Sequence, residues 1–342
     1  MAFLCLIKAE IICIIGNRCS NIYIQAAAAG GLSPPEGWPA KALGGYAMKR
    51  SFILMLIVPF LWALNFVFGK MLVGILPPFA IAAGRFTVAG IIFGLWIIIC
   101  RKRLPQTDMP FLLNLVMISL TGVVAFNGIL YVGLQYTTVA NSTIVNSFNP
   151  IPTMLLAALI LKEKVTGAQY GGALLSIIGV FIIISAGNVS SLAKFNIGDI
   201  IIFLNTFVWA LFSVLGKKAM KVLSPLESIA FTTVMGLPFL WLLTAWEVHA
   251  YQVTSLPWSA VGLLVFLGIF ASVLAFVWWY QGIRDFGASG AAIFYNLIPL
   301  YTLIISGLYL RETIYAYHII GGLLIIAGIL VSSLSLNKGA AA

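Results

Sequence analysis

Long apolar stretches of about 20 residues, almost free of charged side chains, dominate this chain. An α-helix of that length crosses the hydrocarbon core of a bilayer, whereas the strands of a membrane β-barrel alternate apolar and polar residues over roughly 10 positions. Charged residues make up 8% of the sequence, against about 25% in soluble domains. This composition excludes a soluble globular enzyme and a disordered chain. The sequence predicts an all-α integral membrane protein.

Ten candidate transmembrane helices follow one another with short gaps between them. They are Phe52–Phe68, Pro78–Cys100, Phe111–Leu134, Ala140–Leu161, Gln169–Ser185, Asp199–Leu215, Pro225–Trp246, Trp258–Tyr280, Ser289–Leu310 and Tyr315–Leu334. The residues left over are shared among loops and ends, so no separate extramembrane domain is expected.

Lysine and arginine are distributed unevenly between the two sides of these ten spans. With Lys49 in the cytoplasm, the cytoplasmic side carries twelve counted Lys or Arg residues and the opposite side three, Lys70, Lys194 and Arg311. This bias follows the positive-inside rule and predicts a multi-pass protein of the inner (plasma) membrane with both termini cytoplasmic. The net charge of +10 therefore reflects topology, and no nucleic-acid partner is expected.

Residues 1–47 differ in their hydrophobic pattern from the rest of the chain. Their apolar part is short and is interrupted by Lys8 and Glu10, which counts against a signal sequence. We expect the protein to start at Met48, because Met48-Lys49-Arg50 opens directly into a strong span. The segment before Met48 is then atypical, either a mis-assigned upstream stretch or a disordered tail.

The two halves of the chain repeat each other. Residues 61–70 (LWALNFVFGK) align with residues 208–217 (VWALFSVLGK) at an offset of 147, which becomes 149 later in the repeat. The halves 48–187 and 188–342 then hold five spans each. Because five is odd, the second half enters the membrane from the opposite side, and such inverted-topology repeats are typical of secondary transporters. A duplicated scaffold without transport is the alternative.

The repeat resembles the EamA family of the drug/metabolite transporter superfamily, with two EamA-type five-helix units. The features that carry the resemblance are LWALNFVFGK, Arg85-Phe86, Pro150 and Pro299, LKE and LRE ending at Glu163 and Glu312, and paired glycines in spans 5 and 10. The resemblance covers about residues 50–335. It implies ten helices around a central cavity lined mainly by spans 1, 3, 4, 6, 8 and 9. It also implies export of small metabolites, often amino acids, across the bacterial inner membrane.

Arg85 is the clearest ionisable residue inside a span, and such residues are expensive in a bilayer and often functional. Its counterpart in the second half is Thr232, so the charge breaks the repeat symmetry. One role is to bind a substrate carboxylate. The other is structural or gating, through backbone carbonyls, a helix end or snorkelling toward the outer interface. For Glu163 and Glu312, at span ends, we expect local ion pairing.

Several amide, hydroxyl and aromatic side chains are candidates for lining the cavity. Asn127 and Tyr131 share one helix face, and Asn146 and Asn149 share another. The full set of substrate-binding candidates is Trp62, Asn65, Arg85, Asn127, Tyr131, Asn146, Asn149, Trp209, Ser213, Tyr280 and Tyr295. Helix–helix hydrogen bonding is the alternative role for the polar members of this set.

Pro150 and Pro299 occupy matching places in spans 4 and 9. A proline in mid-helix removes one backbone hydrogen bond and frees a carbonyl group. We therefore predict gating or hinge roles for both, with a tolerated kink as the alternative.

These patterns predict a secondary transporter that exports amino acids or related small metabolites by alternating access. The alternatives are a transporter of the same fold for a nucleotide derivative, vitamin or drug, and a membrane enzyme or lipid-handling scaffold. No catalytic constellation is visible, so the protein is not expected to be an enzyme. The cysteines and histidines form no metal-ligand pattern, and no cofactor is expected. The expected partners are a small solute and the lipid bilayer, and a monomer is compatible with the sequence.

Overall fold

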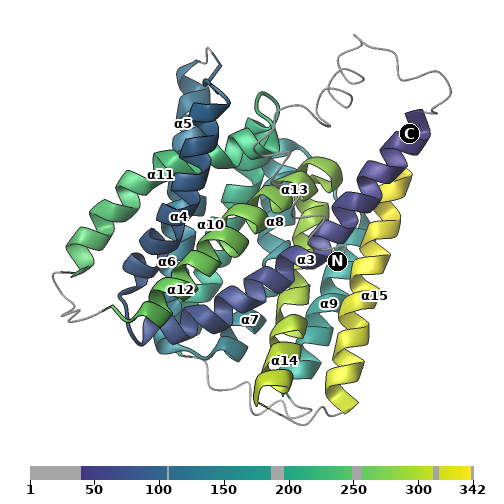
Figure 1. Cartoon of the computed structure of the whole chain (residues 1–342). Coiled ribbons are helices and arrows are strands. Elements are labelled where there is room, and N and C mark those ends of the chain that lie inside the picture. Colours follow the sequence, from purple (N-terminus) through teal and green to yellow (C-terminus); the bar gives the residue numbers. More distant parts are fainter. Residues whose placement is uncertain (1–39, 106–107, 186–195, 249–255, 311–315, 340–342) are drawn as a thin grey trace.

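The computed structural model describes residues 40–105, 108–185, 196–248, 256–310 and 316–339, and every regular element in these ranges is a helix. Figure 1 shows them as a bundle of long helices. The elements are α3 (Ala40–Val73), α4 (Pro78–Ile99), α5 (Met109–Ile118), η1 (Ser119–Ala125), α6 (Phe126–Tyr136), α7 (Val139–Asn146), α8 (Pro150–Leu156), η2 (Ala157–Leu161), α9 (Gly167–Ser185), α10 (Ile197–Ala219), α11 (Pro225–Val248), α12 (Trp258–Phe266), η4 (Leu267–Leu274), α13 (Ala275–Ala292), η5 (Ile293–Asn296), α14 (Leu297–Leu310) and α15 (Ala316–Gly339).

Seven helical segments in the described chain are long and apolar enough to cross a membrane. The segments are Arg50–Val73, Pro78–Ile99, Met109–Tyr136, Val139–Leu161, Ile197–Ala219, Pro225–Val248 and Trp258–Ile305. Two shorter apolar helices, Gly167–Ile182 and Ile319–Ser332, complete the set. The prediction of an α-helical membrane protein is confirmed.

The predicted boundary at residue 47 falls within a helix. Most of residues 1–47 lie outside the described ranges, but α3 begins at Ala40 and runs without interruption through Met48 to Val73. The first predicted span, Phe52–Phe68, is therefore shorter than the helix that contains it.

Local sequence signals fix several helix starts. In α10, the Asn196 side chain accepts a hydrogen bond from the Asp199 N–H, and the Asp199 carboxylate accepts one from the Asn196 N–H. This capping box satisfies backbone donors that have no partner within the helix. Asp108 caps α5 in a similar way by accepting from the Phe111 N–H.

Two of the three π-helical segments in the described chain, η1 and η4, occupy equivalent positions in the two repeats. An offset of 149 residues brings Ser119–Ala125 onto 268–274, within Leu267–Leu274. Such π-helical segments are rare in proteins overall, but those that do occur are often found at functional sites. Each of these two segments leads directly into a helix that carries pocket residues, η1 into α6 and η4 into α13.

Pro150 and Pro299 do not lie in the middle of continuous α-helices, contrary to the sequence-based prediction. A turn at 147–149 separates α7 from α8, so that Pro150 is the first residue of α8. The 3₁₀ segment η5 precedes α14, which places Pro299 in its first turn. Proline is well suited to this position because the first turn has no intrahelical partner for its N–H.

Helices α9 and α15 pack closely through glycines. A methyl group added at Gly172 would collide with the Gly328 carbonyl oxygen, and one at Gly179 would collide with that of Gly321. From the first contact to the second, the residue number rises from 172 to 179 along α9 and falls from 328 to 321 along α15. The two helices are therefore antiparallel. Small residues allow this close approach in membrane bundles.

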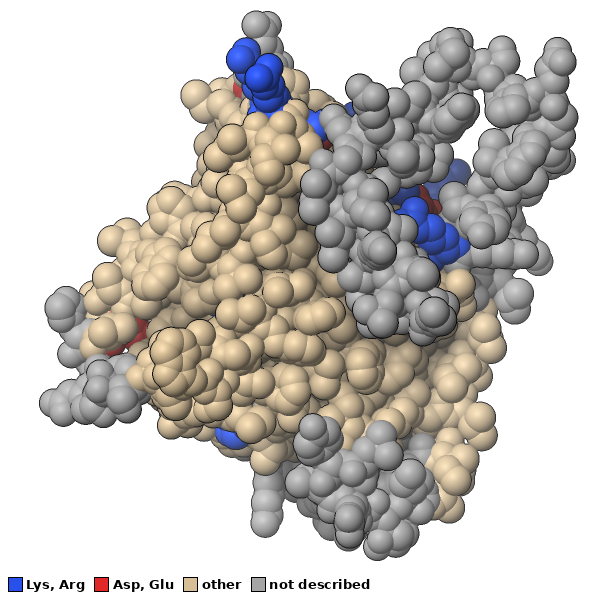
Figure 2. Space-filling view, in the orientation of Figure 1, with Lys and Arg blue, Asp and Glu red and all other residues tan. Residues whose placement is uncertain are grey.

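The surface of the described chain is divided into apolar and charged zones. Figure 2 shows Lys and Arg side chains gathered toward the upper end of the molecule and a broad band without charged side chains below them. Large apolar side chains such as Ile98, Leu159, Leu242 and Leu323 are more than half exposed. An exposed apolar band of this kind is suited to contact with lipid tails.

Candidate functional site

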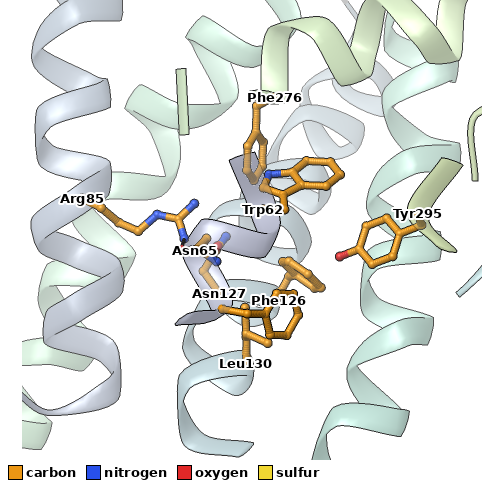
Figure 3. A pocket seen from close by; sticks show the side chains of 9 residues that line it. Trp62, Asn65, Arg85, Phe126, Asn127, Leu130, Phe276 and Tyr295 are labelled. Carbon is orange, nitrogen blue, oxygen red and sulfur yellow. Dashed lines mark hydrogen bonds between the residues drawn. The ribbon is translucent and has the colours of Figure 1, made fainter. Parts of the chain in front are cut away.

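A small pocket lies in the centre of the bundle, and Figure 3 shows the side chains around it. In this conformation it has room for about one water molecule. Residues from α3, α4, α6, α13 and η5 line it, namely Trp62, Asn65, Phe66, Arg85, Phe126, Asn127, Leu130, Phe276 and Tyr295. The pocket is mainly aromatic, with one charged side chain and two amides.

Arg85 is the only charged residue that lines this pocket, and it is 1% exposed. Its Nε donates to the Ser272 hydroxyl at 2.8 Å, and one terminal nitrogen donates to the Asn65 Oδ1 at 2.5 Å and to the Tyr131 hydroxyl at 2.7 Å. The Tyr131 hydroxyl also donates to the Asn65 Oδ1, at 2.7 Å. These bonds direct the guanidinium into the interior of the bundle, toward α3, α6 and η4.

The charge of Arg85 is not balanced by any carboxylate in the described chain. Its three hydrogen-bond partners are neutral oxygens, and its second terminal nitrogen, Nη2, bonds to no residue in the described ranges. The ring of Phe86, 5.1 Å from the guanidinium carbon, adds a cation–π contact. A buried charge is costly unless it is paired. The arrangement is therefore suited to receive an anionic group.

Close packing of η4 against α4 brings Ser272 to Arg85. A methyl group at Gly268 would meet the Arg85 carbonyl oxygen at 2.8 Å and the Val88 side chain at 2.6 Å. Only a glycine fits there without displacing one helix. The Ser272 hydroxyl also donates to the Leu267 carbonyl oxygen at 3.2 Å, within the π segment. Sequence reasoning missed Ser272, because its counterpart at an offset of 149 is Val123 and no symmetry marks it.

Aromatic rings form the remainder of the pocket and the layer behind it. Trp62 and Trp209 occupy equivalent repeat positions, and their ring centroids lie 5.0 Å apart in an edge-to-face arrangement. Trp62 also contacts Tyr295 at 5.4 Å and Phe276 at 6.0 Å. Figure 3 shows the Tyr295 hydroxyl pointing toward the space between Trp62 and Phe126. Within the part of the chain described here, that hydroxyl forms no hydrogen bond.

The structure brings together six of the predicted cavity residues. Five of them line the pocket: Trp62, Asn65, Arg85, Asn127 and Tyr295. The sixth, Tyr131, forms hydrogen bonds with Arg85 and Asn65. The Asn127 side-chain amide donates to the Gly122 and Val123 carbonyl oxygens of η1, at 2.6 and 3.3 Å. Its polar side chain therefore also completes the π segment.

The other predicted cavity residues lie away from the pocket. Trp209 is in the layer behind Trp62, the Ser213 hydroxyl accepts a hydrogen bond from Trp279 at 3.3 Å, and Tyr280 reaches only the Phe212 carbonyl oxygen, at 3.5 Å. The resemblance implies that span 6 lines the cavity, but its residues pack behind the pocket and do not line it. Span 2 was not among the spans implied to line the cavity, yet it supplies Arg85.

Asn146 and Asn149 lie at the break between α7 and α8 and do not line the pocket. The Asn146 amide nitrogen donates to the Ser142 carbonyl oxygen at 2.9 Å, and the Asn149 Oδ1 accepts from the Thr153 hydroxyl at 3.0 Å. The other side-chain polar atom of each asparagine is buried without a hydrogen-bond partner in the described chain.

A second polar cluster joins the two repeats at one end of the bundle. The Glu163 carboxylate pairs with Lys217 at 2.7 Å and accepts from the Ser289 hydroxyl at 2.9 Å and from the N–H groups of Ala288 and Ser289. Gly287, with φ +80°, makes the turn that presents these N–H groups. Glu163 was expected to pair locally, but its partners lie 54 to 126 residues away.

Electrostatics favour the ionised form of Glu163. Burial raises the pKa of this carboxyl, but the hydrogen bonds from Lys217, Ser289 and the Ala288 N–H, with the charge of Lys217, outweigh burial. The net effect holds the pKa of Glu163 below its usual value. We call Glu163, Lys217, Ala288 and Ser289 the Glu163 latch.

Comparisons with known proteins agree with this architecture. The sequence model described as the EamA-like transporter family matches residues 49–185 and 196–334. "Uncharacterized transporter YyaM" of Bacillus subtilis (strain 168) is 32% identical over 285 residues, covering 82% of this chain and 93% of that protein. An uncharacterized transporter of Archaeoglobus fulgidus is 27% identical, covering 83% and 98%. A crystal structure with 18% identity has a TM-score of 0.67, covers 85% of this chain and 98% of its own, and shares the fold.

Proposed function

Because this chain belongs to the EamA-like transporter family, we propose that it is a secondary transporter that exports amino acids or related small carboxylates across the inner membrane. The observation that carries the proposal is Arg85, a buried guanidinium that lines the central pocket without a carboxylate partner in the described chain. A carboxylate of the solute supplies the missing charge through charge-assisted hydrogen bonds.

The proposed architecture has ten crossings. The segment Trp258–Ile305 has 48 residues, which as one continuous helix would measure about 72 Å, more than twice the bilayer core. The non-helical backbone of Gly287 supports its division into two crossings. When this segment is divided in two, the seven long segments become eight crossings. The helices α9 and α15 bring the number of crossings to ten. The two repeats are then 48–187 and 188–342.

The packing of α9 on α15 supports an inverted relation between the repeats. By sequence, Gly172 corresponds to Gly321 and Gly179 to Gly328. The contact of Gly172 with Gly328 therefore becomes the contact of Gly179 with Gly321 when the repeats are exchanged. A two-fold axis in the membrane plane has this effect on antiparallel helices, and such axes relate the halves of many secondary transporters.

Alternating access follows from this arrangement. The pocket lies between the repeats and has room for about one water molecule, so it must widen to admit a solute. The Glu163 latch closes one end in the present conformation. We propose that rocking of the repeats breaks the latch, that this end is cytoplasmic, and that both termini lie on the same side. In Figure 1, α3 begins and α15 ends toward the upper end of the bundle, in support of this orientation.

Counterflow in proteoliposomes tests the proposal. Vesicles loaded with unlabelled amino acids are supplied with labelled ones, using the wild type, Arg85→Ala and the matched control Arg103→Ala, whose side chain is exposed outside the spans. We expect uptake of at least one amino acid or related carboxylate by the wild type and the control. Loss of charge-assisted hydrogen bonds should reduce uptake by Arg85→Ala by about tenfold or more. Equal uptake by Arg85→Ala and the control would contradict the role of Arg85.

The same assay separates the alternative solutes. A cationic drug calls for a buried carboxylate, and the nine residues that line the described pocket include none. A nucleotide derivative carries several negative charges, but the pocket lining supplies a single cation. Uptake of a cationic drug or a nucleotide derivative, with no uptake of any carboxylate, would change the proposed solute and leave the transporter fold unchanged.

A further inference from the structure

We propose that the Arg85 pocket selects aromatic monocarboxylates that lack an amino group, of the 3-arylpropanoate type, over the corresponding amino acids. This inference rests on the proposed transport function and narrows its substrate class. Three properties of the pocket carry it: a single unbalanced cation, a wall of aromatic rings, and the lack of any acidic group to receive an ammonium.

The charge of the pocket limits the solute to one anionic group. Three of the hydrogens of Arg85 are directed to Ser272, Asn65 and Tyr131, while Nη2 bonds to no described residue and remains available to a ligand. A carboxylate bound there neutralises the guanidinium without displacing its partners. A second carboxylate would be buried among apolar rings without a cation, at a large desolvation cost.

The rings around the pocket favour an aromatic body. Trp62, Phe66, Phe126, Phe276 and Tyr295 supply five of the nine lining side chains. Aromatic pairs gain stability from edge-to-face and offset contacts beyond the area they bury. The Tyr295 hydroxyl, directed into the pocket on the side away from Arg85 in Figure 3, offers one polar contact at the far end of such a body.

The pocket has little to offer an ammonium group. No Asp or Glu lines it, and the Asn65 Oδ1 already accepts from both Arg85 and Tyr131. An ammonium carries three donors and would lie near the positive charge of Arg85. Cation–π contacts between the ammonium and the rings offset only part of the free energy needed to remove the ammonium from water. An amino acid therefore binds with its ammonium poorly satisfied, and the analogue without that group avoids this cost.

Direct binding to the purified full-length protein in lipid nanodiscs tests this inference. Four probes share one ring: 3-phenylpropanoate, phenylalanine, 3-phenylpropanamide and phenethylamine. We expect calorimetry to give 3-phenylpropanoate a Kd about tenfold or more below those of phenylalanine and the amide, with no binding of phenethylamine. In Arg85→Gln, which keeps hydrogen-bonding capacity without charge, the preference for the carboxylate over the amide should disappear. If Arg85→Gln does not fold, the wild-type ratio of carboxylate to amide tests the same point.

The outcomes separate this inference from the function on which it rests. Phenylalanine binding as tightly as 3-phenylpropanoate, or more tightly, overturns the selection against the amino group and leaves transport intact. Displacement of 3-phenylpropanoate by an equal concentration of nitrate shows a general anion site and overturns the aromatic selection. Failure of every labelled carboxylate and amino acid to enter proteoliposomes overturns the proposed function itself.

Discussion

Tyr131 and Tyr280 occupy equivalent positions in the two repeats but have different surroundings. The Tyr131 hydroxyl bonds to Arg85 and to Asn65, whereas the Tyr280 hydroxyl reaches only the Phe212 carbonyl oxygen, at 3.5 Å. Arg85 and Asn65 have Thr232 and Phe212 as their counterparts, so the second repeat has no equivalent of this polar cluster. At these equivalent positions, only the first repeat carries a charged side chain.

Replacing the two tyrosines with phenylalanine gives a matched test at this scale. Tyr131→Phe removes a hydrogen bond to a charged group, which is worth about 1.5–3 kcal/mol, and should weaken carboxylate binding by about tenfold or more. Tyr280→Phe removes only the long contact and should leave the Kd unchanged. Calorimetry on both variants checks this, and equal effects of the two would argue against a specific role of Tyr131 in holding Arg85.

Among the helices, α9 and α15 depend on glycine at particular positions. Gly172 faces the backbone of α15 at Gly328, but its neighbour Gly171 has no atom within 4 Å of where a side chain would begin. The same residue type therefore has a packing role at one position and none at the next. Helix periodicity explains the difference, because adjacent residues point about 100° apart.

Gly172→Ala should destabilise the protein, and Gly171→Ala should not. Overpacking costs about 1–3 kcal/mol, whereas alanine at an open helical position is favourable by up to about 1 kcal/mol. Thermal unfolding in detergent, followed by circular dichroism, should show a lower Tm for Gly172→Ala alone. A normal Tm for that variant would mean that α9 and α15 can separate at little cost.

Across the whole molecule, the Glu163 latch connects the repeats at one end. Glu163 follows η2 in the first repeat, while Lys217 and Ser289 belong to the second. Lys70, the repeat counterpart of Lys217, instead donates to the Leu134 and Thr137 carbonyl oxygens, at 2.6 and 2.8 Å. Equivalent lysines are thus engaged differently at the two ends of the bundle.

Glu163→Gln should loosen this end. The amide keeps some hydrogen bonds but loses the ion pair, so a cysteine placed in the pocket at Leu130 should react faster with an impermeant thiol reagent added from the Glu163 side. Asp108→Asn is the control, because Asp108 caps only α5. Unchanged labelling in Glu163→Gln would show that the latch does not limit access.

The pH dependence of access follows from the direction of the pKa shift. The pKa of Glu163 is held below its usual value in the closed conformation, so closure favours the ionised carboxyl. The stabilisation is present above the ordinary pKa of a glutamate, about 4.3, and is lost as pH falls through the lowered value. Labelling of the Leu130→Cys variant should therefore be constant through neutral and mildly acidic pH. A marked increase between pH 7 and 6 would contradict this.

The membrane class, the approximate positions of the helices, the internal repeat and the charge of Arg85 within a span could all be predicted from hydropathy and spacing. These properties depend on local composition and spacing, which hydropathy along the chain reports directly. The sequence could also group Asn127 with Tyr131, because helical periodicity places them on one face.

Which residues contact one another depends on how the helices pack in three dimensions. The bond that Arg85 donates to Ser272 joins residues 187 positions apart, and the bonds that Ser289 donates to Glu163 join residues 126 positions apart. Asn146 and Asn149 shared a helix face by sequence, yet the break before α8 leaves them outside the pocket. Such contacts arise from packing between helices, where one glycine such as Gly268 sets how closely two backbones approach. No pattern along a single helix contains that information.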